Sequence, residues 1–266
     1  MSFDVAADAY DRFMGRYSIP LAPVFADFAG IARGQRVLDV GCGPGALSGE
    51  LVRRLGPETL SAVDPSVSFV EAIRQRQPSV DARRATAEGL PFEDAAFDAA
   101  LAQLVVHFMT DPMAGLCEMA RVTRPGGIVA ACVWDHEGGT GPLDVFWRAA
   151  HELDPDVMDE SKLAGARQGH LRELFEQAGL IGIEDGVLEV RVEHPSFDAW
   201  WEPYTMGVGP AGAYVADLDD ETRDRLRDRC RDSLPPAPFV QTARAWAARG
   251  IAAGTEVSPA ARRGTS

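Results

Sequence analysis

The stretch VLDVGCGPG at residues 37–45 decides the expected fold. Its first part suits a buried strand, its second is a glycine cluster, and the apolar spacing of residues 46–55 then predicts a helix. Glycines permit tight turns and the close approach of a ligand to the backbone. Gly41, Gly43 and Ala46 also satisfy the loose dinucleotide-binding pattern G-x-G-x-x-G/A, which by itself is a weak signal. The stretch therefore predicts a strand–turn–helix unit with a ligand beside the turn.

Strand and helix patterns alternate outward from this stretch. After a first strand at 36–40, strands are predicted at 60–63, 80–85, 98–104 and 128–134. Gly56 is expected to end the helix at 46–55, and Ser66 to cap the next helix. Asp111 and Pro112 are expected to be the N-cap and the first residue of a helix over 111–122. The RPGG segment at 124–127 is predicted to form a turn. This alternation is typical of a parallel α/β sheet with right-handed crossovers. Ligands of such sheets bind beyond the carboxyl ends of the strands. The ends of the first, second and fourth strands should therefore line one crevice.

The later part of the chain offers two more strands, at 180–192 and 242–248. The Asp-Gly pair at 185–186 also permits a hairpin turn inside the first of them. Residues 180–192 can therefore form either one strand or a hairpin.

Two acidic residues mark the expected crevice. Asp39 lies two residues before Gly41, where a carboxylate would repel a pyrophosphate and attract a cationic ligand. Asp64 ends the second strand, where a carboxylate can accept hydrogen bonds from both hydroxyls of a ribose. The alternative for Asp64 is a helix cap or a loop acid. The first acid indicates a cationic ligand and the second indicates a nucleoside.

Two further motifs complete the set. AEGLPF stands at 87–92, and EMARVTRPGG at 118–127 precedes the fifth predicted strand. In this order and spacing, together with VLDVGCGPG and AVDPS, they resemble class I S-adenosylmethionine-dependent methyltransferases of the small-molecule type similar to ubiquinone/menaquinone C-methyltransferases. The resemblance covers residues 35–135. It implies an α/β fold with a Rossmann-like seven-stranded methyltransferase sheet, mostly parallel with the last strand antiparallel, a helical N-terminal lid and insertions that cap the active site.

The resemblance implies S-adenosyl-L-methionine as the cofactor and assigns a role to each matching residue. Gly41, Cys42 and Gly43 would contact the methionine moiety and the sugar through their backbone. Asp39 would orient the loop and the ammonium side of the cofactor. Asp64 would hold both ribose hydroxyls.

A second group of residues would surround the adenine and the methionine end. The resemblance implies that Pro65 and Ser66 lie beside the adenine. Ala87 and Glu88 would flank the adenine edge. Gln103, just past the fourth strand, would lie near the methionine end.

One position departs from the family pattern, and the N-terminal segment adds further candidates. Thr86 stands where family members commonly carry an aspartate that accepts from the adenine amino group. The Thr86 hydroxyl can also accept, but without charge, so either this cofactor contact is weaker or Glu88 takes more of it. Arg16 is expected to meet the methionine carboxylate, and Tyr10 or Tyr17 to pack near the sulfonium. Ordinary helix packing with solvated arginines is the alternative for these three residues.

The expected organisation has four parts, and two helices at 5–14 and 19–29, broken at Gly15, open the first of them. The parts are an N-terminal helical lid (1–34), a cofactor-binding Rossmann-like core (35–135), the rest of the sheet with cap insertions at about 136–168 and 195–240 (136–250), and a disordered tail (251–266).

Methyl transfer from a sulfonium is an in-line displacement. The protein therefore has mainly to align the acceptor with the C–S bond and to exclude water. Alignment alone can supply roughly 7–11 kcal/mol, and a general base adds about 10²–10⁴-fold where the acceptor must lose a proton. His107, after the fourth strand, and His136, after the fifth, are the candidate bases. The alternatives are a packing histidine and a solvated loop histidine. A set of aromatic residues is expected either to line an apolar substrate pocket or to form a small core under the cap: Trp134, Phe146, Trp147, Trp200, Trp201 and Tyr204.

The composition bounds the partners. The 266-residue chain carries 40 acidic and 26 basic side chains, for a net charge of −14, and no C-x-x-C pair among its 4 cysteines. Nucleic-acid affinity depends on a basic field, so no nucleic acid and no anionic membrane surface is expected as a partner. The N-terminus lacks a signal-peptide pattern, and no apolar run approaches the ~20 residues of a membrane span. We expect a cytoplasmic protein with a small-molecule acceptor and no metal site, and the oligomeric state stays open.

Three functions compete. The leading hypothesis is an S-adenosylmethionine-dependent methyltransferase acting on a small, partly apolar molecule, with O-, N- and C-methylation all open. The second is an S-adenosylmethionine-binding protein of the same fold that acts as a sensor or as a non-methylating catalyst, because the motifs indicate binding and not turnover. The third, an NAD-dependent oxidoreductase, depends only on the loose glycine pattern, and Asp39 and the segment 87–92 argue against it.

Overall fold

The computed structural model describes residues 7–253, which contain one seven-stranded sheet in the order β3-β2-β1-β4-β5-β7-β6. Strands β1 to β5 pair in parallel, and β7 runs antiparallel to both of its neighbours. This confirms the expected fold. The strands are β1 (Val37–Val40), β2 (Leu60–Asp64), β3 (Asp81–Arg84), β4 (Phe97–Gln103), β5 (Thr123–Trp134), β6 (Ile181–His194) and β7 (Phe239–Ile251).

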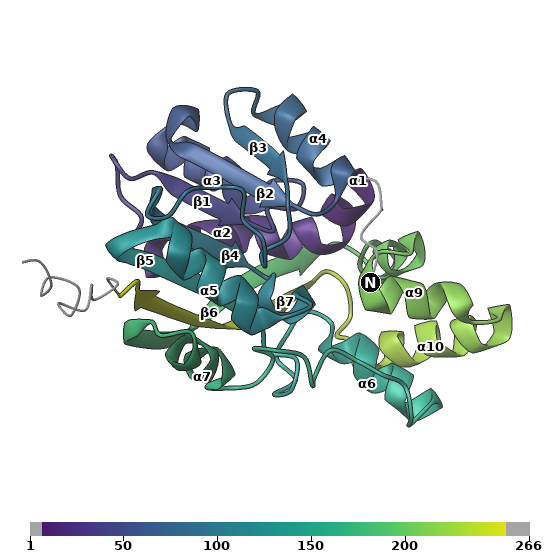
Figure 1. Cartoon of the computed structure of the whole chain (residues 1–266). Helices are drawn as coiled ribbons and strands as arrows, with labels where there is room; N and C mark the ends of the chain where they lie inside the picture. Colours follow the sequence, from purple (N-terminus) through teal and green to yellow (C-terminus); the bar gives the residue numbers. More distant parts are fainter. Residues whose placement is uncertain (1–6, 254–266) are drawn as a thin grey trace, which may run out of the picture.

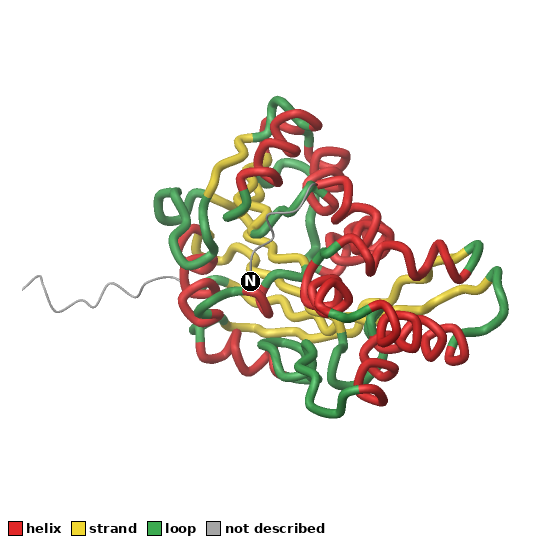
Figure 2. The backbone as a smooth tube through the Cα atoms, turned by 90° about the vertical axis from the view of Figure 1, so that its right-hand side faces the viewer, coloured by secondary structure: helices red, strands yellow, loops and turns green. Residues whose placement is uncertain are grey.

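Each face of the sheet carries its own apolar layer, because successive residues of a strand point to opposite sides. In β4, Ala99 and Leu101 belong to the apolar cluster that includes α2, α3 and α4, whereas Ala100 and Ala102 belong to that of α5 and α7. Figure 2 shows the strands running through the middle of the molecule with helices on both sides. These helices are α2 (Arg16–Phe28), α3 (Ala46–Leu55), α4 (Val67–Arg76), α5 (Pro112–Val122) and α7 (His170–Gln177).

The predicted N-cap is present at α5 and absent at α4. Asp111 caps α5 by accepting a hydrogen bond from the Ala114 amide at 3.0 Å, and Pro112 takes the first helical position. Ser66 precedes α4 but makes no capping hydrogen bond. Its hydroxyl pairs instead with that of Ser68 at 2.9 Å, so the expected cap was wrong.

The N-terminal segment is continuous, and the predicted break at Gly15 was wrong. Helix α1 (Ala7–Tyr10) passes through a π-helical turn, η1 (Asp11–Gly15), directly into α2. Gly15 keeps helical angles of φ −56° and ψ −35°. Phe13 and Met14 are buried in this turn. A glycine costs a helix only about 1 kcal/mol relative to alanine, which the burial of two large apolar side chains outweighs.

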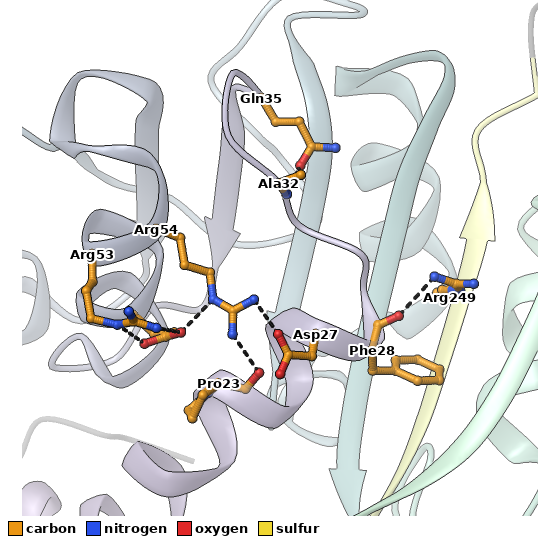
Figure 3. A network of polar contacts seen from close by, with 9 residues as sticks. Pro23, Asp27, Phe28, Ala32, Gln35, Arg53, Arg54 and Arg249 are labelled. Atoms are coloured by element: carbon orange, nitrogen blue, oxygen red, sulfur yellow. Dashed lines mark hydrogen bonds and ion pairs between the residues drawn. The ribbon is translucent and has the colours of Figure 1, made fainter.

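Polar contacts fasten α2 to the core at both sides (Figure 3). The Arg54 guanidinium of α3 donates to the Asp27 carboxylate at 2.6 Å and to the Pro23 carbonyl at 2.9 Å. From the other side, Arg249 of β7 donates to the Phe28 carbonyl at 3.1 Å. The segment expected to form a lid is therefore anchored at its C-terminal end, close to the sheet.

Two predicted turns are absorbed into strands. The Asp-Gly pair at 185–186 lies inside β6, where Asp185 pairs with Ala248 and Gly186 with Ala247, so the hairpin alternative was wrong. The RPGG segment at 124–127 lies at the start of β5, but the pairing with β4 passes from Thr123 directly to Ile128, so these four residues form the irregularity between the two strands. Pairing with β7 decided the segment at 185–186, and a local turn signal does not contain that information.

The helices of the two insertions gather at one side of the molecule, where α6 packs on α10 (Figure 1). One insertion follows β5 and contains α6 (Asp144–Leu153). The other separates β6 from β7 and contains α8 (Phe197–Trp201), the 3-10 turn η4 (Glu202–Met206), α9 (Gly209–Asp217) and α10 (Asp220–Ser233). We call these two insertions the cap.

The C-terminal boundary differs from the prediction. Strand β7 continues to Ile251 and Ala252 is buried, so the expected disordered tail does not include these two residues. Residues 254–266 of that tail, like residues 1–6 of the N-terminal part, lie outside the described residues. Within residues 7–253, no helix combines the length and the apolarity needed to cross a bilayer.

Candidate functional site

The glycine turn after β1 adopts a backbone that side chains rarely allow. Gly41 and Gly45 have φ angles of +68° and +108°. A Cβ atom on Gly41 would lie 2.5 Å from the Val105 side chain, and one on Gly45 would lie 2.6 Å from Ile73. Gly43, with φ +53°, has no heavy atom within 4 Å of an added Cβ. The turn is thus closed by packing at two glycines and faces open space at the third.

The amides of this turn are already paired within the protein. The Gly41 and Cys42 amides both donate to the Val63 carbonyl, at 2.8 and 2.9 Å. The Gly43 amide donates to Oδ2 of Asp64 at 2.9 Å. These bonds join the ends of β1 and β2, so the turn and Asp64 form one rigid edge. A ligand would meet the open side of Gly43 first.

Asp64 has the geometry expected of a ribose-binding acid. Only 6% of its surface is exposed, and its Oδ1 accepts from the Ser66 amide at 2.8 Å. Burial raises the pKa of this carboxyl, while the Ser66 and Gly43 amides oppose the rise. Each oxygen accepts one backbone amide and keeps a second acceptor site. Two ribose hydroxyls can therefore still bind.

Asp39 lies within β1 and contacts α3. It is 1% exposed, and its Oδ2 accepts from the Ser48 hydroxyl at 2.6 Å. Burial raises its pKa to about 7, against the Ser48 hydrogen bond. Asp39 thus connects the strand to the helix that follows the turn, in line with the expected loop-orienting role.

The residues expected around the adenine lie on the loops after β2 and β3. Oε1 of Glu88 accepts from the amides of Thr110 and Asp111, at 2.8 and 3.2 Å. Burial works to raise its pKa, but the backbone hydrogen bonds prevail and the pKa is lowered. Glu88 therefore connects its loop to the start of α5. Thr86 and Pro65 are exposed, and Ala87 is buried.

Two residues expected at the methionine end are held by protein groups. The Arg16 guanidinium donates to the carbonyls of Ala199 and Trp200, both at 3.1 Å, and its Nε donates to that of Phe13. These bonds connect α2 to the cap and do not favour a role for Arg16 on a ligand carboxylate. Gln103 is buried and donates through Nε2 to the Ser18 carbonyl at 3.0 Å, while its Oε1 has no hydrogen-bond partner.

A small cavity brings together segments that are far apart in the sequence. Its walls come from the N-terminal segment, the residues after β4, the end of β5 and the cap. We call it the cap cavity. Its lining residues are Tyr10, Phe13, Met14, Leu104, His107, Phe108, Trp134, His136, Leu143, Glu160, Val208, Gly209 and Pro210.

Both candidate bases line the cap cavity. The His107 and His136 rings lie 5.7 Å apart between centroids. His107 Nδ1 and His136 Nε2 are buried atoms without a hydrogen-bond partner. Burial lowers the pKa of His107 well below its ordinary value and that of His136 to about 4. Both rings are therefore neutral at pH 7, and a neutral imidazole can accept a proton.

Two residues of this cavity were missed by the sequence analysis, Glu160 and Leu104. Glu160 is only 4% exposed, and its Oε2 accepts from Trp147 Nε1 at 2.6 Å. Burial raises the Glu160 pKa to about 7. Leu104, at the end of β4, has a φ of +62°, a strained conformation for a side-chain-bearing residue and one that is common at functional sites. No local motif accompanies either residue, because both depend on packing between distant segments.

The six aromatic residues separate into two groups. Trp134 lines the cap cavity. The other five pack against one another, with the rings of Phe146 and Tyr204 stacked 4.7 Å apart and those of Trp200 and Tyr204 at 4.8 Å. In the N-terminal segment, Tyr10 lines the cavity. Tyr17 is fully buried and donates to Gln241 Oε1 at 2.7 Å, so it is a core residue.

Comparisons with known sequences find similarity over the central segment. Residues 38–131 match a family model described as a methyltransferase domain. An uncharacterised methyltransferase of Mycobacterium tuberculosis is 39% identical over 135 residues, which are 51% of this chain and 52% of that protein. A demethylmenaquinone methyltransferase of Renibacterium salmoninarum is 36% identical over 110 residues, 41% of this chain and 46% of that protein. The chain spans about half the length of the curated relatives it matches.

Solved structures share the fold across most of the chain. The YcgJ protein of Bacillus subtilis superposes with a TM-score of 0.57 at 20% identity, covering 88% of this chain and 98% of that one. The [4+2]-cyclase SpnF superposes with a TM-score of 0.53 at 22% identity, covering 89% and 81%. At these identities the likeness shows the fold alone, which agrees with the strand order found here.

Proposed function

We propose that this chain is an S-adenosylmethionine-dependent methyltransferase, because residues 38–131 match a family model described as a methyltransferase domain. It transfers a methyl group by in-line displacement to a small, partly apolar acceptor. In this proposal residues 35–135 form the cofactor-binding core, residues 1–34 the lid, and the insertions of residues 136–250 the part of the protein that surrounds the acceptor.

One observation carries the proposal. A glycine turn with an open side and a buried acid lie beside a cavity that contains histidine nitrogens without hydrogen-bond partners. Gly43 faces open space, and Asp64 keeps free acceptor sites at the same edge. Tyr10 connects the two regions. It lines the cap cavity, and its pKa is raised first by burial and then by the negative charge of Asp64. A nucleoside at the edge would thus have one end toward the cap cavity.

Each part of the site has a separate task in this reaction. Asp64 binds the ribose hydroxyls, and Asp39 and Ser48 keep the glycine turn in place. The bound cofactor supplies a methyl group already activated by its sulfonium charge. The cap cavity holds the acceptor away from water, and His107 Nδ1 accepts a proton from an acceptor that has to lose one. Alignment supplies the largest share of the rate.

A non-methylating catalyst of the same fold is the second candidate. The solved structure of a [4+2]-cyclase shares this fold, so the fold itself does not require methyl transfer. Transfer of labelled methyl from S-adenosylmethionine to an acceptor separates the two candidates. Binding of the cofactor with no transfer to any acceptor that binds would favour the second one.

The first test is calorimetric titration of the full chain with S-adenosylmethionine and with NAD. We expect micromolar affinity for S-adenosylmethionine and none for NAD. Asp64→Ala should weaken binding about 100-fold or more, because each hydrogen bond to a charged group contributes roughly 1.5–3 kcal/mol. Glu58→Gln, an exposed acid far from the turn, should bind as the wild type does. Tighter binding of NAD, or no binding of S-adenosylmethionine by protein free of carried-over nucleoside, would overturn the proposal.

A further inference from the structure

Glu160 takes no part in the reaction steps of the proposed function. It comes from the loop after α6, and only 4% of its surface is exposed. Glu160 lines the cap cavity together with His107 and His136. Trp147 Nε1 donates to Oε2 at 2.6 Å, which orients the carboxyl group. A carboxylate removed from water without a cationic partner is costly, so the group either keeps its proton to higher pH or pairs with a cation, and a positive ligand group would stabilise its ionised form.

The charge of the cavity is one-sided. Among the described residues that line it there is neither a lysine nor an arginine, and Glu160 is the acid. The two histidines are neutral and present unpaired ring nitrogens. A carboxylate or phosphate acceptor would therefore meet no compensating charge. A group that donates hydrogen bonds or carries positive charge would meet several partners.

The apolar walls add a second preference for a cation. Tyr10, Phe13 and Trp134 line the same cavity as Glu160. Aromatic rings attract ammonium groups, by about 0.5–2 kcal/mol according to how far the pair is desolvated. These rings can also pack against the apolar part of a small molecule.

We propose that the acceptor is a small amine with an apolar body, and that Glu160 is the residue that binds its ammonium group. This proposal deepens the proposed function and rests on it. Nitrogen methylation is thereby favoured over methylation at oxygen or carbon.

The reaction balances with the groups present. The ammonium group bound at Glu160 gives one proton to His107 Nδ1 and becomes a free amine. The nitrogen lone pair forms the new N–C bond, and the C–S bond breaks with its electron pair going to sulfur. The product is again an ammonium ion, which Glu160 can hold until it leaves. The proton on His107 returns to solvent when the cavity opens.

The experiment compares probes of one size and three charges, 2-phenylethylamine, 2-phenylethanol and 3-phenylpropanoate. Each is titrated calorimetrically into the full chain at pH 8, with and without saturating S-adenosylhomocysteine. We expect the amine to bind at least tenfold more tightly than the alcohol and the acid. Glu160→Gln should weaken amine binding at least tenfold and leave the alcohol within twofold.

The matched control is Glu137→Gln, an exposed acid of the same insertion, which should bind all three probes as the wild type does. An alcohol or acid that binds as tightly as the amine, no amine binding, or an unchanged amine affinity in Glu160→Gln overturns the proposal. The outcome is distinguishable from failure of the proposed function, because S-adenosylhomocysteine binding is measured in the same samples. Bound S-adenosylhomocysteine with no preference for the amine rejects the role of Glu160 alone.

Discussion

The edge formed by the glycine turn and Asp64 differs from the cap cavity in how its polar atoms are paired. At the edge, the Gly41, Cys42 and Gly43 amides and both oxygens of Asp64 make hydrogen bonds within the protein. In the cap cavity, one nitrogen of His107 and one of His136 are buried without a partner. Unpaired buried polar atoms cost stability, so they are expected where a ligand supplies the missing partner.

The difference also separates a rigid region from an adaptable one. The residues of the edge lie within one strand–turn–helix–strand unit, residues 37–66. The cap cavity is assembled from the N-terminal segment, two strand ends and two insertions. A framework built from short-range contacts suits a constant cofactor, whereas loops on that framework can change with the acceptor. The predictions below test this division, beginning with the largest expected effect.

Removing the candidate base should have the largest effect. With 2-phenylethylamine as acceptor, we expect His107→Ala to lower kcat about 10²–10⁴-fold, the usual contribution of a general base. Binding of S-adenosylmethionine should stay within twofold, because His107 lies in the cap cavity and not at the edge. Steady-state transfer of labelled methyl measures the first and calorimetry the second. His170→Ala on α7 is the control, and an unchanged kcat would remove His107 from the mechanism.

Adding a methyl group to the glycine turn should destabilise the rigid edge. Gly41→Ala combines a left-handed backbone with a Cβ atom 2.5 Å from Val105, and we expect it to lower the free energy of unfolding by about 2–5 kcal/mol. Gly43→Ala, where the added Cβ has open space, should cost only about 1–2 kcal/mol. Urea unfolding measures both. The added change Val105→Ala should recover part of the loss in Gly41→Ala. Equal losses for the two glycine variants would show that packing does not decide the turn.

Glu160 should make stability depend on pH in a defined direction. Burial raises its pKa from 4.5 to about 7. Between these pH values the folded chain keeps the Glu160 proton, whereas the unfolded chain releases it. The contribution of Glu160 to the free energy of unfolding is therefore full below pH 4.5 and is lost as pH rises through 7. The free energy of unfolding of Glu160→Gln, taken relative to that of the wild type, should therefore rise by up to about 3 kcal/mol between pH 4 and pH 8. Urea unfolding at a series of pH values measures this gain. A constant difference would contradict a protonated Glu160, and Glu137→Gln is the control.

The smallest effect is expected where the N-terminal segment meets the cap at the surface. Arg12 and Glu202 form an ion pair at 2.8 Å with more than half of each side chain exposed, 55% and 58%. Exposed pairs contribute about 0–1 kcal/mol, so Arg12→Ala should change the free energy of unfolding by less than about 1 kcal/mol. Arg16→Ala should cost more, since it leaves two cap carbonyls without their donor. A loss for Arg12→Ala as large as that for Arg16→Ala would contradict this ranking.

Local signals predicted the central helices well. The apolar spacing and the stop at Gly56 placed the helix at 46–55, and Asp111 with Pro112 placed the start of α5, both as observed. The failures share one cause. Gly15 and the pair 185–186 carry turn signals that packing and strand pairing override. Energies of about 1 kcal/mol per residue cannot decide a conformation when tertiary contacts contribute more.

The candidate site divides in the same way. The positions of Asp39, Asp64 and the glycines could be predicted because strand, turn and helix follow one another in the chain. Their roles toward a cofactor stay predictions. The hydrogen bonds of Arg16 could not be predicted, since its partners Ala199 and Trp200 lie more than 180 residues away. Glu160 gave no signal, because an acid in a loop becomes unusual only when a cavity closes around it.

The sequence by itself determined the parallel sheet, the glycine turn and the acids at its edge, because each follows from residues close together in the chain and from the stereochemistry of the backbone. Only the tertiary structure decided which polar groups are buried together. His107, His136 and Glu160 meet in one cavity because β4, β5 and the cap insertions converge there. Burial, and with it the raised pKa of Glu160 and the lowered pKa values of the two histidines, is a property of that convergence.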